Sequence, residues 1–333
     1  MGSRGELRVD TKWIIDPTLV SIGDKIGEGS HTEVYWGIYK SLTVVVKVIK
    51  QDIGEHKVAQ IKTRFLREVA MLSTLQHENV VKFIGASMEP MMVIITELLK
   101  GGTLKKHLAN MKPSNLDGHI AIKFALDVAR AMECLHSHGI IHRDLRPANL
   151  LLTEDHKIVK LVDFGLAREG SLDIMTAEIG AYRWMAPELY NMVTLKYGEK
   201  KHYNHKVDVY SFAMVLWELI NNKLPFEGLT PMKAAYVADH KNERPSVDDL
   251  PRDLASLITS CWNEDPNVRP DFSKIIHMLE RCVFVGLPPQ SKLSHDSSGP
   301  SALVALTDRS TKETQETTTE NKARGIFSCF YRC

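Results

Sequence analysis

The sequence predicts an α+β fold of two lobes, in which a small strand-rich lobe precedes a larger helical one. Between residues 20 and 49, apolar side chains alternate with the period of two that strands show. After residue 102 they recur at spacings of three and four, which is typical of helices. Gly101 and Gly102 interrupt the chain between these patterns. We therefore place the small lobe at residues 20–97 and the large lobe at residues 102–284.

Each element follows from its own apolar spacing. Two alternating sets predict neighbouring strands joined near residues 40–42, namely Val34, Trp36 and Ile38, and then Val44, Val46 and Val48. A short apolar run at residues 93–96 predicts the last strand of the small lobe. Three sets at helical spacing predict helices with a buried stripe: Ile61, Phe65, Val69 and Leu72; Phe124, Val128, Met132 and Leu135; Val209, Phe212, Leu216 and Leu219. Gly139 follows the second set, as glycine does where a helix ends.

The composition bounds the class of protein. A chain of 333 residues that is 44% hydrophobic and 25% charged has enough apolar surface for a large core. Its formal net charge of +1 provides no field for binding nucleic acid, so we expect no nucleic-acid partner. Five cysteines without paired spacing suit a reducing compartment. No apolar run approaches the ~18 residues of a membrane span, and we expect a cytoplasmic protein.

The two ends of the chain differ from its middle. Residues 1–19 form a polar lead-in, and residues 285–333 form a tail that we expect to be disordered. Within the tail, Thr307–Arg324 contains Ala323 as its one apolar residue, so it cannot bury enough surface to fold.

The last nine residues of the tail have a different composition. Gly325–Cys333 contains three aromatic residues beside Cys329 and Cys333. Acylation of either cysteine would give a peripheral membrane contact and partial membrane association. The alternative is a sticky tail without such a role.

Four short motifs within 47 residues carry the chemistry: His142-Arg143-Asp144, Asn149, Asp163-Phe164-Gly165 and Ala186-Pro187-Glu188. In this order they supply a base, two oxygen ligands for a metal and an ordered substrate segment, the parts that transfer a phosphoryl group from ATP to a hydroxyl. We predict that Asp144 is the catalytic base and that Asn149 and Asp163 hold Mg²⁺. The alternative for each is a buried structural polar residue, but all three lie in polar loops after apolar stretches.

A second set of residues is predicted to bind the nucleotide. The glycine-containing stretch from Gly27 to Val34 lies between two strands, where small residues let backbone N–H groups approach phosphates. Lys47 would hold the phosphates and Glu68 would orient Lys47. The residues predicted to contact nucleotide are Ile26, Gly27, Glu28, Gly29, Val34, Val45, Lys47, Thr96, Glu97, Leu99 and Leu151.

Residues 20–284 resemble a protein kinase catalytic domain of the tyrosine-kinase-like, Raf-like branch. The similarity rests on Arg183–Glu188 (RWMAPE), Asp208–Phe212 (DVYSF) and Cys261–Pro270 (CWNEDPNVRP). Trp13–Leu19 (WIIDPTL) resembles the lead-in of plant Raf-like kinases of the kinase-kinase-kinase type.

The resemblance implies further roles. Thr96 would stand beside the adenine, and Glu97 to Leu99 would supply hinge hydrogen bonds. Glu188 would pair with Arg269, and Asp208 would anchor the catalytic loop. An internal stack linking the lobes would contain Leu72, Phe83, His142 and Phe164.

Four positions depart from the family pattern. Thr32 replaces the third glycine of the phosphate loop, and Val45 replaces a smaller residue above the adenine. Arg146, which we assign to catalysis, stands where serine/threonine kinases have lysine. Ala181 replaces a serine or threonine near the substrate hydroxyl. None of the four removes the base or a metal ligand, so we predict an active enzyme whose turnover these changes lower.

The predicted function is that of an ATP- and Mg²⁺-dependent serine/threonine protein kinase in intracellular signalling. Pro147 favours serine/threonine specificity, whereas Trp184 and Trp262 lie in motifs shared with tyrosine kinases, so dual or tyrosine specificity is an alternative. Two different classes of protein would share many of these motifs, namely a pseudokinase scaffold that binds nucleotide and a small-molecule kinase. Arg143 could pair with a phosphate that an upstream kinase places on Ser171 or Thr176.

Overall fold

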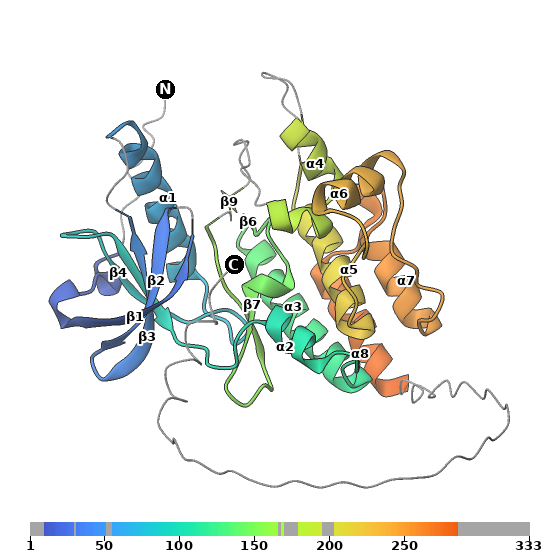
Figure 1. The fold of residues 1–333 in the computed structure, drawn as a ribbon, viewed down its shortest axis with the longest axis horizontal. Helices are drawn as coiled ribbons and strands as arrows, with labels where there is room; N and C mark the ends of the chain where they lie inside the picture. The colour runs from blue at the N-terminus through green and yellow to red at the C-terminus, as the bar shows by residue number, and fades with distance from the viewer. Residues whose placement is uncertain are drawn as a thin grey trace, which may run out of the picture.

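The computed structural model describes residues 10–29, 31–50, 55–165, 168–169, 179–194 and 203–285, which fold into two lobes (Figure 1). The strand-rich lobe with helix α1 lies on one side, and the helical lobe lies on the other (Figure 1). Small strands from β6 to β9 lie where the lobes meet. The predicted bilobal α+β fold is confirmed.

The small lobe is built on a five-stranded antiparallel sheet. Its strands pair in the order β1-β2-β3-β5-β4, with bounds Val20–Glu28, Thr32–Tyr39, Leu42–Ile49, Val93–Glu97 and Phe83–Ser87. The register sets Val34 opposite Lys47 and Val45 opposite Thr96. Since alternate residues of a strand face opposite sides, Val44 and Val46 join the core on one face of the sheet, whereas Lys47 points to the other.

Residues of the lead-in pack along β4, the edge strand of this sheet, and extend the small lobe before residue 20. The rings of Trp13 and Phe83 lie 5.1 Å apart, and the Ile15 N–H donates to the Ala86 carbonyl at 3.0 Å. Ile15 is buried against Val44 and Val46. A side chain at Gly85 would meet Ile15 Cγ2 at 2.3 Å, so glycine is required for this close approach.

Helix α1 (Glu55–Thr74) covers the other face of the small-lobe sheet (Figure 1). Its predicted stripe is buried, with Ile61, Phe65, Val69 and Leu72 each at most 5% exposed. The helix prediction is therefore confirmed for this segment.

The large lobe contains seven helices among the described residues: α2 (Leu104–Met111), α3 (Gly118–Ser137), α4 (Pro187–Thr194), α5 (Lys206–Asn221), α6 (Pro231–His240), α7 (Arg252–Cys261) and α8 (Phe272–Val285). Helix α3 begins where the Asp117 carboxylate accepts backbone N–H bonds and ends before Gly139 at φ +70°. Helix α5 is buried on all sides from Val207 to Ile220, and not only along the predicted stripe.

Two short antiparallel pairs hold the loops at the junction of the lobes. β6 (Ile140–Ile141) pairs with β9 (Arg168–Glu169), and β7 (Leu150–Leu152) pairs with β8 (Val159–Leu161). The motif residues from His142 to Asn149 lie between β6 and β7, and Asp163 follows β8. Among the described helices, none has the length and apolar character to cross a membrane.

Candidate active site

Asp208 of α5 fixes the backbone of the catalytic loop. Its two carboxylate oxygens accept the N–H groups of His142 at 2.8 Å and Arg143 at 2.7 Å, and His136 Nε2 lies 2.9 Å from Oδ2. Arg143 adopts φ +67°, which is sparsely populated for a residue with a side chain. Burial opposes ionisation of Asp208, but the hydrogen bond and charge of His136 and the Arg143 N–H outweigh it, so its pKa is lowered. The predicted anchor is thus an ionised carboxylate that holds two consecutive N–H groups.

The predicted base, Asp144, is oriented by the two polar residues that follow it. Asn149 Nδ2 donates to Asp144 Oδ2 at 2.7 Å and to its carbonyl at 2.8 Å. Arg146 Nε lies 3.1 Å from Asp144 Oδ1. Burial raises the pKa of Asp144, although Arg146 and His142 oppose the rise. A higher pKa makes the carboxylate a better proton acceptor.

Asp163 has the opposite electrostatic environment. The positive charge of Lys47 holds the pKa of Asp163 below its ordinary value. Its Oδ1 accepts from Gly165 N at 3.1 Å and lies 3.4 Å from Lys47 Nζ. The side chain keeps 46% of its surface exposed, and the residue has φ +62°. Asp163 therefore presents a permanent negative charge, whereas Asp144 is poised to accept a proton.

Lys47 joins the two lobes at the site. Its Nζ lies 2.8 Å from Glu68 Oε1 of α1. Burial favours the neutral amine, but the charges of Glu68 and Asp163 outweigh it and raise the pKa of Lys47. The structure thus brings together the predicted partners Lys47, Glu68 and Asp163, which are far apart in the sequence.

The glycine-containing loop is a tight turn between β1 and β2. The Gly29 N–H donates to the Thr32 carbonyl at 2.8 Å. A side chain at Gly29 would meet Thr32 Oγ1 at 2.6 Å, so a Cβ at position 29 would require the Thr32 hydroxyl to move. The Glu28 carboxylate is bound by Lys50 and by Lys25, which lower the pKa of Glu28 to about 2. Its side chain is therefore already paired, and its backbone is the part suited to a ligand.

The residues predicted to enclose the adenine come from both lobes. Ile26 and Val45 belong to the small-lobe sheet, and Leu151 belongs to β7 of the large lobe; all three are at most 6% exposed. Thr96, which pairs with Val45, is partly buried, and Leu99 is buried. The Glu97 carboxylate accepts from the Lys82 N–H and from Lys160 Nζ, each at 2.7 Å. Glu97 thereby links the last strand of the small lobe to β8 of the large lobe.

The internal stack predicted from the resemblance is buried. Leu72, Phe83, His142 and Phe164 are each at most 5% exposed. The rings of His142 and Phe164 meet edge to face at 5.7 Å.

The substrate side of the large lobe is braced by buried charges. Arg269 makes a two-pronged contact with Glu188, at 2.6 Å and 3.1 Å, and its side chain has no exposed surface. Arg183 Nη1 donates to the carbonyls of Pro225 and Phe226 at 3.0 Å and 2.8 Å, and its Nη2 to Leu229. The predicted pairing of Glu188 with Arg269 is present.

Three positioning residues were not predicted from the sequence: His136, Tyr203 and Glu218. His136 contacts Asp208, and Tyr203 Oη accepts from Arg143 Nη1 at 2.8 Å. Glu218 accepts from Trp184 Nε1 at 3.0 Å. None lies in a short motif, although a polar Glu218 inside an otherwise apolar helix was a signal. Ser171 and Thr176, like Cys329 and Cys333, lie outside the described residues.

The comparisons with known proteins agree with the geometry. The profile of the family described as "Protein tyrosine and serine/threonine kinase" matches residues 20–279. The chain is 42% identical over 301 residues to the "Serine/threonine/tyrosine-protein kinase HT1" of Arabidopsis thaliana, covering 88% of this chain and 74% of that protein. It is 40% identical over 280 residues to the "Serine/threonine-protein kinase STY17" of the same plant, covering 82% and 46%. A third Arabidopsis relative, the "Serine/threonine-protein kinase VIK", is 38% identical over 286 residues, covering 81% and 62%.

Proposed function

The chain belongs to the protein tyrosine and serine/threonine kinase family, and on that premise we propose that it transfers the γ-phosphoryl group of ATP to serine and threonine hydroxyls of other proteins. The observation that carries the proposal is the geometry of one site, where Asn149 Nδ2 holds the Asp144 carboxylate at 2.7 Å and Lys47 Nζ lies 2.8 Å from Glu68 and 3.4 Å from Asp163. The pKa of Asp144 is raised and that of Asp163 is lowered, which suits a proton acceptor beside a fixed charge. A signalling role follows from an enzyme that modifies proteins.

Asp144 orients the substrate hydroxyl and takes its proton as the oxygen bonds to the γ-phosphorus, while the bond from that phosphorus to the bridging oxygen breaks and ADP leaves. Asn149 and Arg146 hold the Asp144 carboxylate in place, and Asp208 holds the backbone beneath it. Positioning of this kind supplies most of the rate in phosphoryl transfer, since little covalent chemistry is required of the protein.

Lys47 is the cation for the phosphates of ATP. Glu68 keeps its ammonium group directed to the site, and the strand that follows the turn at Gly29 pairs with β3, so that Val34 lies opposite Lys47. Ile26, Val45 and Leu151 provide apolar surfaces for adenine, with Thr96 and the segment from Glu97 to Leu99 at its edge.

Asn149 and Asp163 fit a hard divalent cation such as Mg²⁺. Because Asn149 uses Nδ2 to hold Asp144, its side-chain oxygen is the atom that faces a ligand, and Asp163 adds an ionised, half-exposed carboxylate. When bound, Mg²⁺ would neutralise charge on the phosphate oxygens.

Serine and threonine are the proposed acceptors. Two of the relatives above are named serine/threonine kinases, and one is named a serine/threonine/tyrosine kinase. Phosphoamino-acid analysis of the products separates these cases. Phosphotyrosine alone would contradict the proposal, and phosphotyrosine beside phosphoserine would assign dual specificity.

The decisive experiment measures phosphate transfer from Mg²⁺-ATP to a generic protein substrate for the parent, Asp144→Asn and Asp163→Asn. The expected loss in both variants is at least about 100-fold, since each removes a group at the reacting centre. Asp155→Asn is the matched control because Asp155 is an exposed turn carboxylate. A parent with no more transfer than the two variants, but with intact ATP binding, would identify a scaffold that binds ATP.

Regulation and location complete the proposal. Phosphorylation of Ser171 or Thr176 by an upstream kinase would raise activity through Arg143. A cytoplasmic protein is proposed from its cysteine usage and composition, with a peripheral membrane contact through Cys329 or Cys333 as a separate proposal. Mass spectrometry of the activated enzyme and fractionation of a Cys329→Ser/Cys333→Ser variant test these points.

A further inference from the structure

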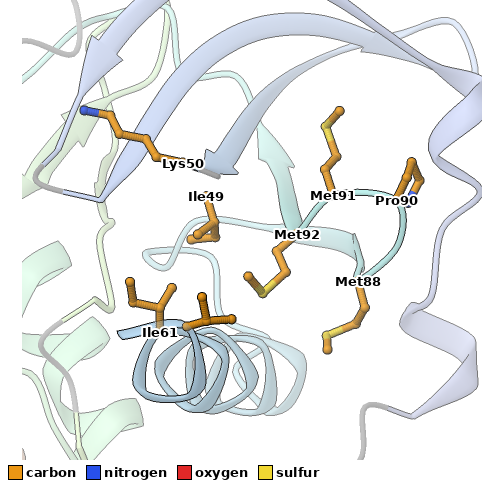
Figure 2. A pocket seen from close by; sticks show the side chains of 8 residues that line it. Ile49, Lys50, Ile61, Met88, Pro90, Met91 and Met92 are labelled. Carbon is orange, nitrogen blue, oxygen red and sulfur yellow. The ribbon is translucent and has the colours of Figure 1, made fainter. Parts of the chain in front are cut away.

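A methionine-rich cavity lies in the small lobe, and none of the residues that line it belongs to the phosphate-transfer site described above (Figure 2). It has a volume of about 190 Å³. The end of β3, the first half of α1 and the β4–β5 connection form its walls, through Ile49, Val58, Ile61, Met88, Met91 and Met92. Lys50 also lines it, but its ammonium group binds Glu28, so the aliphatic stem faces the cavity. The cavity is therefore open to an apolar ligand.

The lining favours an aromatic side chain. Three methionines in one wall give a flexible, polarisable surface, and sulfur–aromatic contacts contribute about 0.3–1.5 kcal/mol each. An engineered apolar cavity of about 150 Å³ binds benzene, so this volume admits one ring. Met88 and Met92 extend toward α1 (Figure 2). Val58, at the rim, is 43% exposed.

The same chain carries a segment of matching chemistry. Residues 286–326 contain no Phe, Tyr or Trp, whereas Phe327, Phe330 and Tyr331 follow within five positions. For a random coil, which their composition predicts, these 41 residues would have a root-mean-square span of roughly 32–38 Å. A domain of this size is roughly 45–50 Å across. Fully extended, 41 residues span up to about 140 Å, so the segment can reach the small lobe from the end of α8. Tethering then gives an effective concentration on the order of millimolar.

We propose that residues 325–333 dock in this cavity of their own chain, with Phe327 or Phe330 filling it. Phe327 and Phe330 lie three positions apart, and in this arrangement one ring would enter the cavity while the other would cover its methionine rim.

Docking is coupled to the site through two elements. Ile49 lies two residues after Lys47 on β3, and Val58 and Ile61 lie on α1 together with Glu68. A ring between these elements ties β3 to α1 and holds the Lys47–Glu68 pair closed. This consequence rests on the proposed kinase activity, whereas docking itself does not.

The binding test uses a labelled peptide of residues 325–333 under reducing conditions and the full chain carrying Phe327→Ala/Phe330→Ala. Fluorescence anisotropy without ATP should show binding at least tenfold tighter to this variant than to the parent, whose own segment competes. Adding Val58→Asp should abolish binding. Ile120→Asp is the matched control, since Ile120 is 44% exposed on α3 of the other lobe. Equal binding to the Val58→Asp and Ile120→Asp proteins overturns the proposal.

Further measurements distinguish docking in this cavity from binding of the segment to a membrane or to a second copy of the chain. Hydrogen exchange in α1 should slow when the peptide binds, and unchanged exchange in α1 despite binding would contradict the cavity assignment. Vesicles of phosphatidylcholine with phosphatidylserine test whether the peptide binds a membrane surface instead. A peptide that binds these vesicles but not the folded chain also overturns the proposal. Concentration-dependent dimerisation of the parent that Phe327→Ala/Phe330→Ala abolishes would assign the segment to a second copy and contradict docking within one chain.

The activity readout comes last. Phe327→Ala/Phe330→Ala should lower phosphate transfer several-fold, and added peptide should restore it. Should the parent show no transfer at all, the kinase proposal fails while the anisotropy and exchange results still decide docking.

Discussion

Arg143 Nη1 donates a 2.8 Å hydrogen bond to Tyr203 Oη, which joins the catalytic loop to the residues just before α5. Arg143 is the residue predicted to pair with a regulatory phosphate on Ser171 or Thr176, and it is 5% exposed. A neutral hydroxyl thus occupies part of the position where an anion would bind. The contact offers the loop a partner before any phosphate arrives.

Tyr203→Phe should therefore make activity more dependent on phosphorylation. Loss of the hydroxyl removes one partner of a buried guanidinium, at a cost of about 1–3 kcal/mol in the free energy of unfolding. We expect kcat of phosphatase-treated enzyme to fall several-fold, with a smaller change in phosphorylated enzyme. Tyr236→Phe is the control, since Tyr236 is 45% exposed on α6. Equal losses in both phosphorylation states would show that Tyr203 supports the fold alone.

The turn at Gly29 gives a prediction about ATP binding. Gly29→Ala should raise the KM for ATP several-fold, because the new Cβ would lie 2.6 Å from Thr32 Oγ1 and displace the turn. Thr32→Gly removes that clash, so the double variant should bind ATP better than Gly29→Ala alone. Steady-state kinetics of the parent, the two single variants and the double variant gives the coupling between the two changes in the KM for ATP. Simple addition of the two effects would refute the steric explanation.

Glu218 predicts a dependence of stability on pH. Burial raises the pKa of Glu218 to about 7, against the opposing hydrogen bond from Trp184, whereas its ordinary value is 4.5. The folded protein therefore keeps a proton that the unfolded chain releases, and stability falls as pH rises from about 4.5 to about 7. Glu218→Gln should flatten this slope and raise the free energy of unfolding at pH 8 by about 1–3 kcal/mol.

Urea unfolding of the parent and Glu218→Gln between pH 5 and pH 8 provides the measurement. Glu227→Gln is a suitable control, because Glu227 is exposed and lies in the same lobe. A slope that Glu218→Gln leaves unchanged would assign the pH dependence to other groups.

For Arg269 we predict a large loss of stability even when lysine, another cation, replaces it. Arg269→Lys should lower the free energy of unfolding by about 2–4 kcal/mol, since a lysine cannot make both contacts to Glu188 and would place a poorly paired ammonium group at a fully buried position. Arg252→Lys, at an exposed position on α7, should change it by less than about 0.5 kcal/mol. Chemical denaturation compares the two. Similar small losses would mean that the Glu188 pair contributes little.

Much of the fold and the candidate site followed from local patterns. The helix over Ile61–Leu72 was predictable because its apolar residues recur with the helical period, and its stripe is buried as expected. Asp144 and Asn149 were predictable because they lie five residues apart in one short motif, and the structure joins them by a hydrogen bond. The packing of Trp13 and Ile15 on β4 was missed, because the lead-in lacks periodicity and gains its contacts from a sheet formed elsewhere.

The sequence by itself determined which chemical groups the site contains. Local motifs and apolar spacing were enough to identify Lys47, Glu68, Asp144, Asn149 and Asp163. The tertiary structure alone decided their partners and charge states. Asp208 reaches the catalytic loop from 65 residues away, and Tyr203 reaches Arg143 from 60. It also decided that the pKa of Asp144 rises while that of Asp163 falls. The physical reason is that burial and Coulomb interactions depend on distances in space, which arise only when remote segments pack together.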